Sequence, residues 1–454
     1  MADTKLTAPP DGEATQLKNL RPADLAKALA LHERLLSGRP GGRRALLSGF
    51  RLENTDFSAR DLRESDFTGA ALSGSLFQRT KLQFSNFYAA DLRRSNFNGA
   101  DLTRADLRGA CFRAASLVGA NLMEADIREA VLARYSASRI PMVVSHGDGQ
   151  SDMTAINAEG ANLSHAKMGG SFTLRADFSE ANLSNADLRN ADLRMSNFRN
   201  AIMTGVNLNG VNAANADFQG AVLTNARIHD ANFDGADLTG AILDLNQISS
   251  PVFARALLPK TPESCNLDLE AALDMHESWV KSAARLGKRL TLDGLDLARC
   301  DFAGRRLTAI SLVQAILRGC NFTGVEMATA NLSRCDLRAA ILRNADLRGA
   351  SLEHAHLNES ILAGADLSPL NDVGSSGRSL SADLRGARLV GADLRGAKLM
   401  HANLAGADLS RAKLDEADLT CANLTGARFI GADIGSATFQ GAIMEGVVGL
   451  GSIS

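Results

Sequence analysis

Apolar residues recur at every fifth position along most of this chain. In the stretch ADLRGARLVGADLRGAKLMHANLAGADL, residues 382–409, a leucine stands at positions 384, 389, 394, 399, 404 and 409. A period of five fits neither the 3.6 residues of an α-helical turn nor the two-residue alternation of a single strand. The chain must therefore turn a corner once in every repeat, and a period this regular is typical of a solenoid.

The repeat is described most simply around its central apolar residue, position i. A small residue, usually Ala, stands at i−2, Asp or Asn at i−1, Leu or Phe at i, and polar residues or Gly at i+1 and i+2. Four runs follow this pattern, and their first and last centres are Leu47 and Leu132, Met153 and Leu243, Leu292 and Leu367, and Leu384 and Met444. The short polar Asp or Asn suits a corner because it can hydrogen-bond to nearby backbone groups. We therefore interpret the many aspartates as structural residues.

Units of the ADLRGADL type resemble the pentapeptide-repeat proteins, and the resemblance covers most of the chain. It implies an all-β solenoid, a right-handed quadrilateral β-helix. Each five-residue unit would form one side, four units would form a coil, and positions i−2 and i would point inward.

The order of Leu and Phe in the first run agrees with a four-sided coil. If four units close a coil, residues 20 apart stack at the strand spacing of about 4.8 Å. The alternation then predicts two opposite columns of stacked rings, one of Phe57, Phe77 and Phe97 and the other of Phe67 and Phe87. Cys300 and Cys320 both occupy i−2 and lie 20 residues apart, so we expect them to stack inside the tube as free thiols.

Two stretches of the chain begin alike, which divides it into two halves. HERLLSGRPGGRRALLSGFRLENTDF, residues 32–57, aligns with HESWVKSAARLGKRLTLDGLDLARCDF, residues 276–302, and matches His32 with His276 and Glu33 with Glu277. Each half is predicted to be a helix followed by a β-helix. The first helix should begin near Pro22, where proline favours a helix start, and the second near Asn266.

The open end of a solenoid exposes apolar side chains and strand edges that must be covered. We expect the two helices to cover these ends. His32, His276 and Trp279, the only tryptophan, are then structural cap residues rather than ligands.

Three segments interrupt the repeats. A linker containing Pro251, Pro259 and Pro262 joins the halves, and loop insertions lie at 136–152 and 368–380. The second insertion is polar and rich in glycine, which is typical of a flexible excursion. The first carries an apolar run that is our candidate partner contact: Ile140, Pro141, Met142, Val143 and Val144. The alternative is that this run folds back on the β-helix wall.

These features predict the following organisation: a disordered tail and N-terminal capping helix in 1–44, a first β-helix in 45–245, a linker and second capping helix in 246–290, a second β-helix in 291–448, and a tail in 449–454. The tail IMEGVVGLGSIS supplies no capping helix. We expect the C-terminal end of the solenoid to mediate self-association, the alternative being that the tail folds over the last coil.

Composition and motifs argue against most chemistry. The 49 basic and 51 acidic residues leave a net charge of −2, which offers no general field for nucleic acid. The chain contains no GxSxG, GxxxxGK[ST] or HExxH motif, and its six cysteines and eight histidines show no metal-ligand spacing. His354 and His356 are expected to be two solvated histidines. We therefore predict no catalytic, metal or cofactor site, and a cytoplasmic protein with no membrane span.

The sharpest alternative comes from the resemblance itself. Pentapeptide-repeat proteins of the quinolone-resistance group act on type II topoisomerases such as gyrase by mimicking the size and negative charge of DNA. Here Asp106 and Asp126 should stack in an acidic column, but Arg108 and Arg128 lie beside them at i+1. A DNA mimic needs a negative face, and this one should be neutral. The same interleaving, with few exposed aromatic residues, argues against direct nucleic-acid binding.

The sequence thus favours a non-enzymatic rigid β-helical scaffold. It would mediate protein–protein interaction through its flat walls and inserted loops, with a protein partner whose identity the sequence does not reveal. DNA mimicry remains the alternative.

Overall fold

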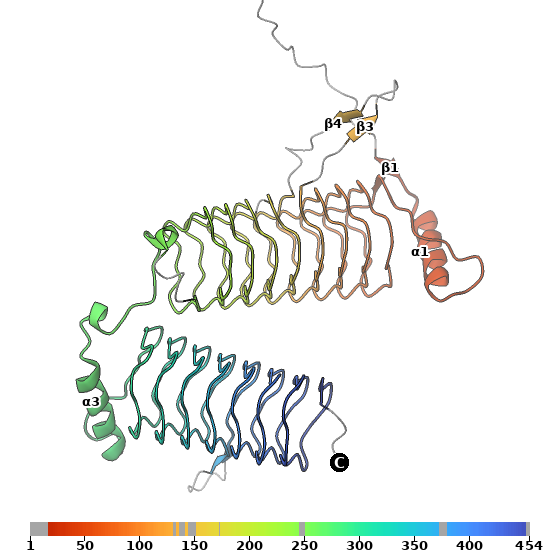
Figure 1. Ribbon diagram of the computed structural model, residues 1–454. Coiled ribbons are helices and arrows are strands. Elements are labelled where there is room, and N and C mark those ends of the chain that lie inside the picture. The colour runs from red at the N-terminus through yellow and green to blue at the C-terminus, as the bar shows by residue number, and fades with distance from the viewer. Residues whose placement is uncertain are drawn as a thin grey trace, which may run out of the picture. The chain divides into compact units, whose positions relative to one another are not determined.

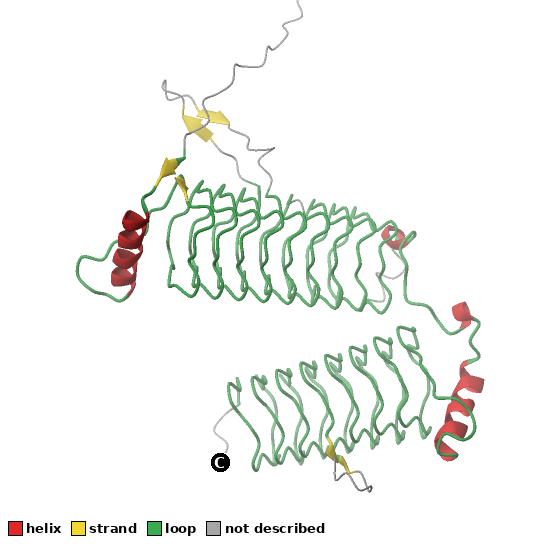
Figure 2. Cartoon of the chain, turned by 180° about the vertical axis from the view of Figure 1, so that it is seen from behind, coloured by secondary structure: helices red, strands yellow, loops and turns green. Residues whose placement is uncertain are grey.

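The computed structural model describes residues 17–129, 133–135, 141–143, 151–171, 173–244, 250–371 and 379–450, with the backbone alone described at 133–135, 141–143 and 371. Its elements are, in chain order, β1 (Lys18–Asn19), α1 (Pro22–Leu36), β2 (Phe50–Arg51), β3 (Ala133–Tyr135), β4 (Pro141–Val143), η2 (Pro251–Phe253), η3 (Glu263–Cys265), α3 (Leu269–Lys281), β5 (Leu370–Asn371) and β6 (Ser379–Leu380). Most of the chain forms stacked coils, drawn as loops in Figure 2. The chain folds into two compact units, which are in the main the first two runs of repeats and the last two.

Repeats in the described runs are joined by parallel β-bridges at position i−1, to the residue 20 positions along the chain, or farther along where an insertion intervenes, as from Cys111 to Asp152. Asp66 pairs with Asn86, Asn86 with Asp106, and Asp106 with Asp126. The backbone N–H of each central residue donates to the next coil, as Leu107 does to the carbonyl oxygen of Asp126 at 2.8 Å. Four units therefore make one coil, and the fold is the right-handed β-helix solenoid that the sequence predicts.

The corners of the coils use the residue types that the repeat supplies. At i−1 the side chain accepts a hydrogen bond from the backbone two residues on, as Asp101 Oδ1 does from Thr103 N–H at 3.0 Å. Position i+2 takes a positive φ even where it is not glycine, for example 56° at Arg104. The expected role of Asp and Asn as corner residues is confirmed.

The interior of the first unit contains the two predicted columns of rings. The distance between ring centroids is 4.9 Å for the pair Phe57–Phe77, 4.6 Å for Phe77–Phe97 and 4.7 Å for Phe67–Phe87. The ring planes in each pair are nearly parallel. The two columns meet edge to face, with Phe57 and Phe67 at 5.6 Å. Each fully buried ring contributes roughly 1.5–3 kcal/mol from burial, and the offset and edge contacts add to it.

The second unit has a core of leucine and alanine, with Cys320 and Cys335 buried among them. Cys300 is half-buried, and all three thiols are free. The expected stacking of Cys300 and Cys320 as free thiols inside the tube therefore agrees with the structure, although Cys300 lies in an outer, less covered coil.

Helix α3 begins later than the sequence suggested. Asn266 adopts a left-handed φ of 54° and ends η3, while the side chain of Asp268 accepts the backbone N–H of Ala271 at 3.0 Å. Asp268 caps the helix because its backbone is extended and its side chain accepts an N–H of the first turn, whereas the left-handed backbone of Asn266 does not suit an N-cap. The helix therefore starts at Leu269.

The segment after the first β-helix contributes part of a further coil. The ring of Phe253 in η2 lies 4.9 Å from that of Phe233, and the carbonyl oxygen of Arg255 accepts the backbone N–H of Gly235 at 3.0 Å. Sequence reasoning assigned this stretch to a linker because it lacks the repeat. The structure shows that an irregular sequence can still complete the stack.

The two insertions leave and rejoin the coils through short antiparallel pairs. Strand β3 pairs with β4, with Ala133 opposite Val143, and β5 pairs with β6, with Leu370 opposite Leu380. Of the predicted contact run, Ile140 and Val144 lie outside the described residues. Pro141, Met142 and Val143 form β4, where the backbone alone is described.

Candidate functional site

The first helix meets the first coil through a buried histidine. Helix α1 lies beside the start of its stack (Figure 1) and buries Leu29 and His32. His32 Nδ1 accepts the backbone N–H of Ala45 at 3.1 Å. Burial lowers the pKa of His32. A neutral ring is needed here because only an unprotonated Nδ1 can accept this hydrogen bond.

The second helix repeats this arrangement. His276 is buried, and its Nδ1 accepts the backbone N–H of Leu290 at 3.0 Å. Burial lowers the pKa of His276 as well, and its ring stacks on that of Trp279 with centroids 5.6 Å apart. Within the described part of the chain, the Nε2 atoms of both histidines are buried without a hydrogen-bond partner. The structure thus brings the predicted cap residues to equivalent junctions.

Each junction also contains an ion pair that sequence reasoning missed. Arg60 contacts Glu33 at 2.9 Å, and Arg305 contacts Glu277 at 3.4 Å. Arg305 also contacts Asp274 at 2.8 Å, and Glu270. Both arginines stand three residues after equivalent phenylalanines, in TDFSAR and CDFAGR, and this shared spacing is the signal that could have revealed them.

A glycine lets the loop after each helix lie directly on the helix backbone. A Cβ added to Gly42 would overlap the backbone nitrogen of Leu35, and one added to Gly287 would overlap the carbonyl oxygen of Met275. No other residue fits such a close approach without moving the chain. The duplicated histidine, ion pair and glycine make the two junctions versions of one structural module.

The walls of the coils are covered by neutral pairs of charges. Where Asp stands at i−1 and Arg at i+1, the two side chains form a two-point ion pair, as Arg194 does with Asp192 at 2.6 Å. The hydrogen bond from Arg194 holds the pKa of the Asp192 carboxyl below its usual range. The same pairing occurs at Arg63–Asp61, Arg93–Asp91, Arg108–Asp106, Arg128–Asp126, Arg189–Asp187, Arg348–Asp346, Arg385–Asp383 and Arg395–Asp393.

The prediction of two solvated histidines at 354 and 356 is wrong for His356. His354 is exposed, whereas His356 is buried in a ladder between Asp336 and Arg388. Burial lowers the pKa of His356 to about 3. Position i−1 faces outward, but a side chain that lies along the wall is covered by the rows above and below it. The repeat pattern alone does not predict this burial.

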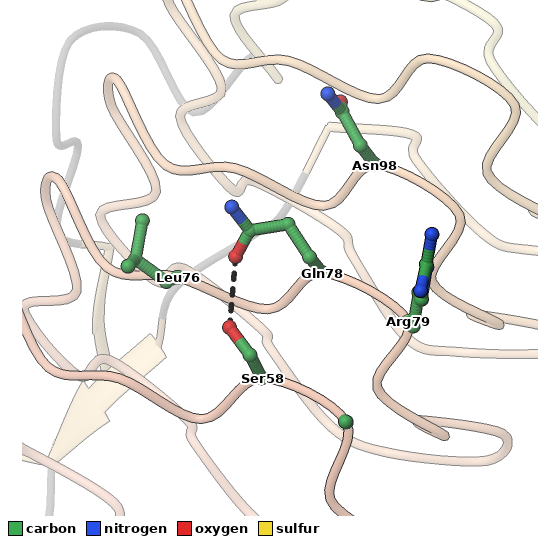
Figure 3. Close-up of a pocket in the computed structure, with 6 residues that line it drawn as sticks. Ser58, Leu76, Gln78, Arg79 and Asn98 are labelled. Carbon is green, nitrogen blue, oxygen red and sulfur yellow. Dashed lines mark hydrogen bonds between the residues drawn. The ribbon is translucent and has the colours of Figure 1, made fainter.

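One wall of the first unit has a shallow hollow of about 480 Å³. It is lined by Ser58, Ala59, Leu76, Gln78, Arg79 and Asn98, which come from three successive coils (Figure 3). The Ser58 hydroxyl donates to Gln78 Oε1 at 2.8 Å. Asn98 Oδ1 accepts the backbone N–H of Val118 at 3.1 Å and the Ser116 hydroxyl at 2.6 Å.

Comparison with known families now places the chain. A family described as pentapeptide repeats matches residues 43–79, 80–117, 159–194, 174–205, 201–240, 296–333, 330–368, 381–415 and 407–446, well over half of the chain. The chain belongs to the pentapeptide-repeat family. The resemblance seen in the sequence is thereby confirmed.

Solved structures of other pentapeptide-repeat proteins are similar to this chain in sequence at a low level. HetL of the cyanobacterium Nostoc sp. strain PCC 7120, described as involved in heterocyst differentiation regulation, is 19% identical, over 93% of this chain and 97% of that one, with a TM-score of 0.17. Rfr23 of the cyanobacterium Cyanothece is 24% identical, over 32% and 90%, with a TM-score of 0.21. QnrB1, a plasmid-mediated fluoroquinolone resistance protein, is 21% identical, over 34% and 91%, with a TM-score of 0.16. No curated protein matches the chain.

Metal clusters and membrane-spanning helices are both absent from the described residues of this pentapeptide-repeat chain. Among the residues that the structure describes, no three His, Cys, Asp or Glu side chains form a group that could hold a metal ion. None of the described helices is both long enough and apolar enough to cross a bilayer.

Proposed function

We propose that this pentapeptide-repeat chain is a non-enzymatic rigid scaffold that mediates protein–protein interaction through its flat walls and inserted loops. The observation that carries this proposal is the fixed register of side chains along a wall. Asn162 Nδ2 donates to Asn121 Oδ1 at 3.0 Å, and Asn182 Nδ2 to Asn162 Oδ1 at 3.4 Å, so successive rows hold each other in place. A pre-organised surface loses little conformational entropy on binding.

The helices α1 and α3 are proposed to cap the two β-helical segments, with His32, His276 and Trp279 as cap residues. The burial of Leu273 within the core cluster of the second unit supports this role. The proposed boundaries of the segments stay at 45–245 and 291–448. The run from Ile140 to Val144 is proposed as a partner contact, and the protein is proposed to be cytoplasmic and to need no cofactor.

A pull-down from a cell extract tests the scaffold, with the intact chain and a variant lacking residues 130–150 as bait. We expect the intact chain to retain a specific protein and the variant to lose or weaken it. Asp152 forms its β-bridge with Cys111, so the coil resumes at Ser151 and Asp152, and both residues are kept. The deletion removes 21 residues and returns the spacing of this pair from 41 to 20 positions, so it should leave the coils intact. Retention of no stable partner by the intact chain would overturn the proposal.

Modulation of a type II topoisomerase by DNA mimicry is the second candidate, favoured by the columns of Asp at i−1. Against it stand the arginines that neutralise those columns at 2.6–2.7 Å, as at Asp106 and Asp126. A supercoiling assay with purified gyrase separates the two functions. Inhibition at low protein concentration would establish the second candidate, and no inhibition is the expected result.

Self-association through the C-terminal end is proposed for the second unit. Ile443 and Val448 on the last coil are 54% and 49% exposed, and the core residues of that coil are only partly buried. Sedimentation velocity over a range of concentrations should show a dimer that Ile443→Asp abolishes. A monomer at all concentrations would contradict it.

A further inference from the structure

The wall that carries the hollow differs from the other walls of the first unit. Its first three rows have Ser58, Gln78 and Asn98 at i+1. Each of the other three walls has, in the same part of the stack, an arginine at i+1 that pairs with an aspartate, namely Arg63, Arg93 and Arg108. Among the lining residues, charge is present only at Arg79. This stretch therefore presents amide groups and one cation instead of neutralised ion pairs.

The side-chain amides of Gln78 and Asn98 leave N–H donors available in the hollow. The orientation of Asn98 is fixed because only its Oδ1 can accept the backbone N–H of Val118, which turns Nδ2 outward. Gln78 Oε1 is engaged by Ser58. Figure 3 shows the amide nitrogens of Gln78 and Asn98 on the same side of the wall. Neither nitrogen has an acceptor among the residues that the structure describes.

Arg79 adds an unneutralised positive charge. Its stem lies along Gly99, where a Cβ would be 3.6 Å from Arg79 Cγ, and its guanidinium group forms no ion pair within the described ranges. Leu76, 37% exposed, adds an apolar surface beside the donors. Asp56, the carboxylate at i−1 in the first row of this wall, accepts the backbone N–H of Ser58 at 2.8 Å and is not part of the lining.

We propose that this hollow receives an acidic side chain, a glutamate or aspartate, of a partner protein. The carboxylate would accept hydrogen bonds from Arg79, Gln78 and Asn98, and the methylene groups of a glutamate would pack on Leu76. Charge-assisted hydrogen bonds to a carboxylate are about twice as strong as neutral ones. The inference rests on the proposed scaffold function and names one contact by which a wall selects its partner.

The chain offers a matched pair of variants. Arg79 occupies position i+2 with a φ of 56°, and asparagine takes the same position at Asn54 and Asn185 with φ values of 56° and 57°. Arg79→Asn should therefore fold normally. Arg94→Asn is the control because Arg94 is also exposed at i+2, with a φ of 57°, but lies outside the hollow.

The test is an NMR titration of the full ¹⁵N-labelled chain with acetylated and amidated triglutamate, and with triglutamine as the neutral probe. We expect triglutamate to shift the side-chain amide resonances of Gln78 and Asn98, and triglutamine to leave them unchanged. Arg79→Asn should raise the Kd for triglutamate about tenfold or more, as loss of one charge-assisted contact does. Arg94→Asn should change it less than about twofold, and added salt should weaken binding.

The inference is overturned if triglutamate leaves Gln78 and Asn98 unmoved, if triglutamine shifts them equally, or if both arginine variants weaken binding alike. These results leave the scaffold itself standing, because the pull-down described above does not depend on the peptides. A chain that binds triglutamate but retains no protein in the pull-down would instead refute the scaffold.

Discussion

The two ends of the second β-helix are built from the same repeat but are covered differently. At the first coil, Leu292, Leu297, Phe302 and Leu307 are at most 1% exposed, with Leu273 of α3 packed among them. At the last coil, the equivalent inward positions Ile434, Phe439 and Met444 are only partly buried. A repeat therefore buries its own side chains only where another layer lies on each side of it.

The comparison teaches that the repeat and the junction with α3 contribute different things. The repeat determines the direction, register and spacing of the coils, but it does not cover the inward side chains of a terminal coil. The junction of α3 adds what the repeat lacks, namely an apolar side chain, a hydrogen-bond acceptor for an unpaired backbone N–H and an ion pair to the next corner.

The largest expected effect comes from truncating the apolar side chain at each end. Leu273→Ala should lower the opening free energy of the first coil by about 2–4 kcal/mol, because it leaves a cavity in a fully buried site. Met444→Ala at the other end should cost less, on the order of 1 kcal/mol, since its side chain is already partly exposed.

Hydrogen exchange of the backbone amides in 292–307 and 429–448, measured on the full chain, reports each end separately. Equal decreases in opening free energy at the two ends would mean that packing against α3 does not stabilise the first coil more than exposure to solvent does. A loss at 429–448 in the Leu273 variant would mean that the second unit opens as one cooperative body.

The second effect is a dependence of stability on pH. Because burial lowers the pKa of His276, the unfolded chain binds a proton that the folded chain excludes. The contribution of His276 to the free energy of unfolding should be fully present above the unfolded pKa of about 6.5. Below that pH the free energy of unfolding should fall by up to about 1.4 kcal/mol per pH unit. The charges near the ring are Arg289 and Glu277.

His276→Gln should reduce this slope. His356, whose pKa burial lowers to about 3, supplies a remaining part of the slope in the same unit. Unfolding by urea at pH 7.5, 6.5 and 5.5 measures the difference. A slope that is the same in His276→Gln and in the parent chain would show that the junction does not need a neutral ring.

The sequence predicts a residue's role where that role follows from its position in the repeat, and not where it depends on neighbours distant in sequence. The coil, the corners and the stacked rings of Phe57, Phe77 and Phe97 follow from the repeat because each position has one geometric role. His32 and His276 were found because the two halves align. Arg60 and Arg305 were missed because they lie beyond that alignment and only the folded coil brings them back to the helix.

The remaining misses have a different cause. The burial of His356 and the coil completed by Phe253 depend on neighbours that are distant in sequence or irregular. The one sign of the hollow in the sequence is that Ser58, Gln78 and Asn98 stand where other repeats have an arginine that pairs with an aspartate. What those side chains leave available to a partner depends on which of their atoms the next coil engages, as Val118 engages Asn98.

The smallest expected effect distinguishes the ion pairs at the junction of α3 from those on the walls of the repeat. Arg305 is 23% exposed and contacts three carboxylates of α3. Its neighbour Arg306 is 50% exposed and, among the described residues, pairs with Glu326 alone at 3.2 Å. Exposed pairs contribute about 0–1 kcal/mol because water and salt screen them. Arg305→Gln should therefore cost roughly 1 kcal/mol at low salt, and Arg306→Gln less than about 0.5 kcal/mol. Urea midpoints of both variants at low and high salt make the comparison, and equal costs would show that the network on α3 is no stronger than a single pair on the wall.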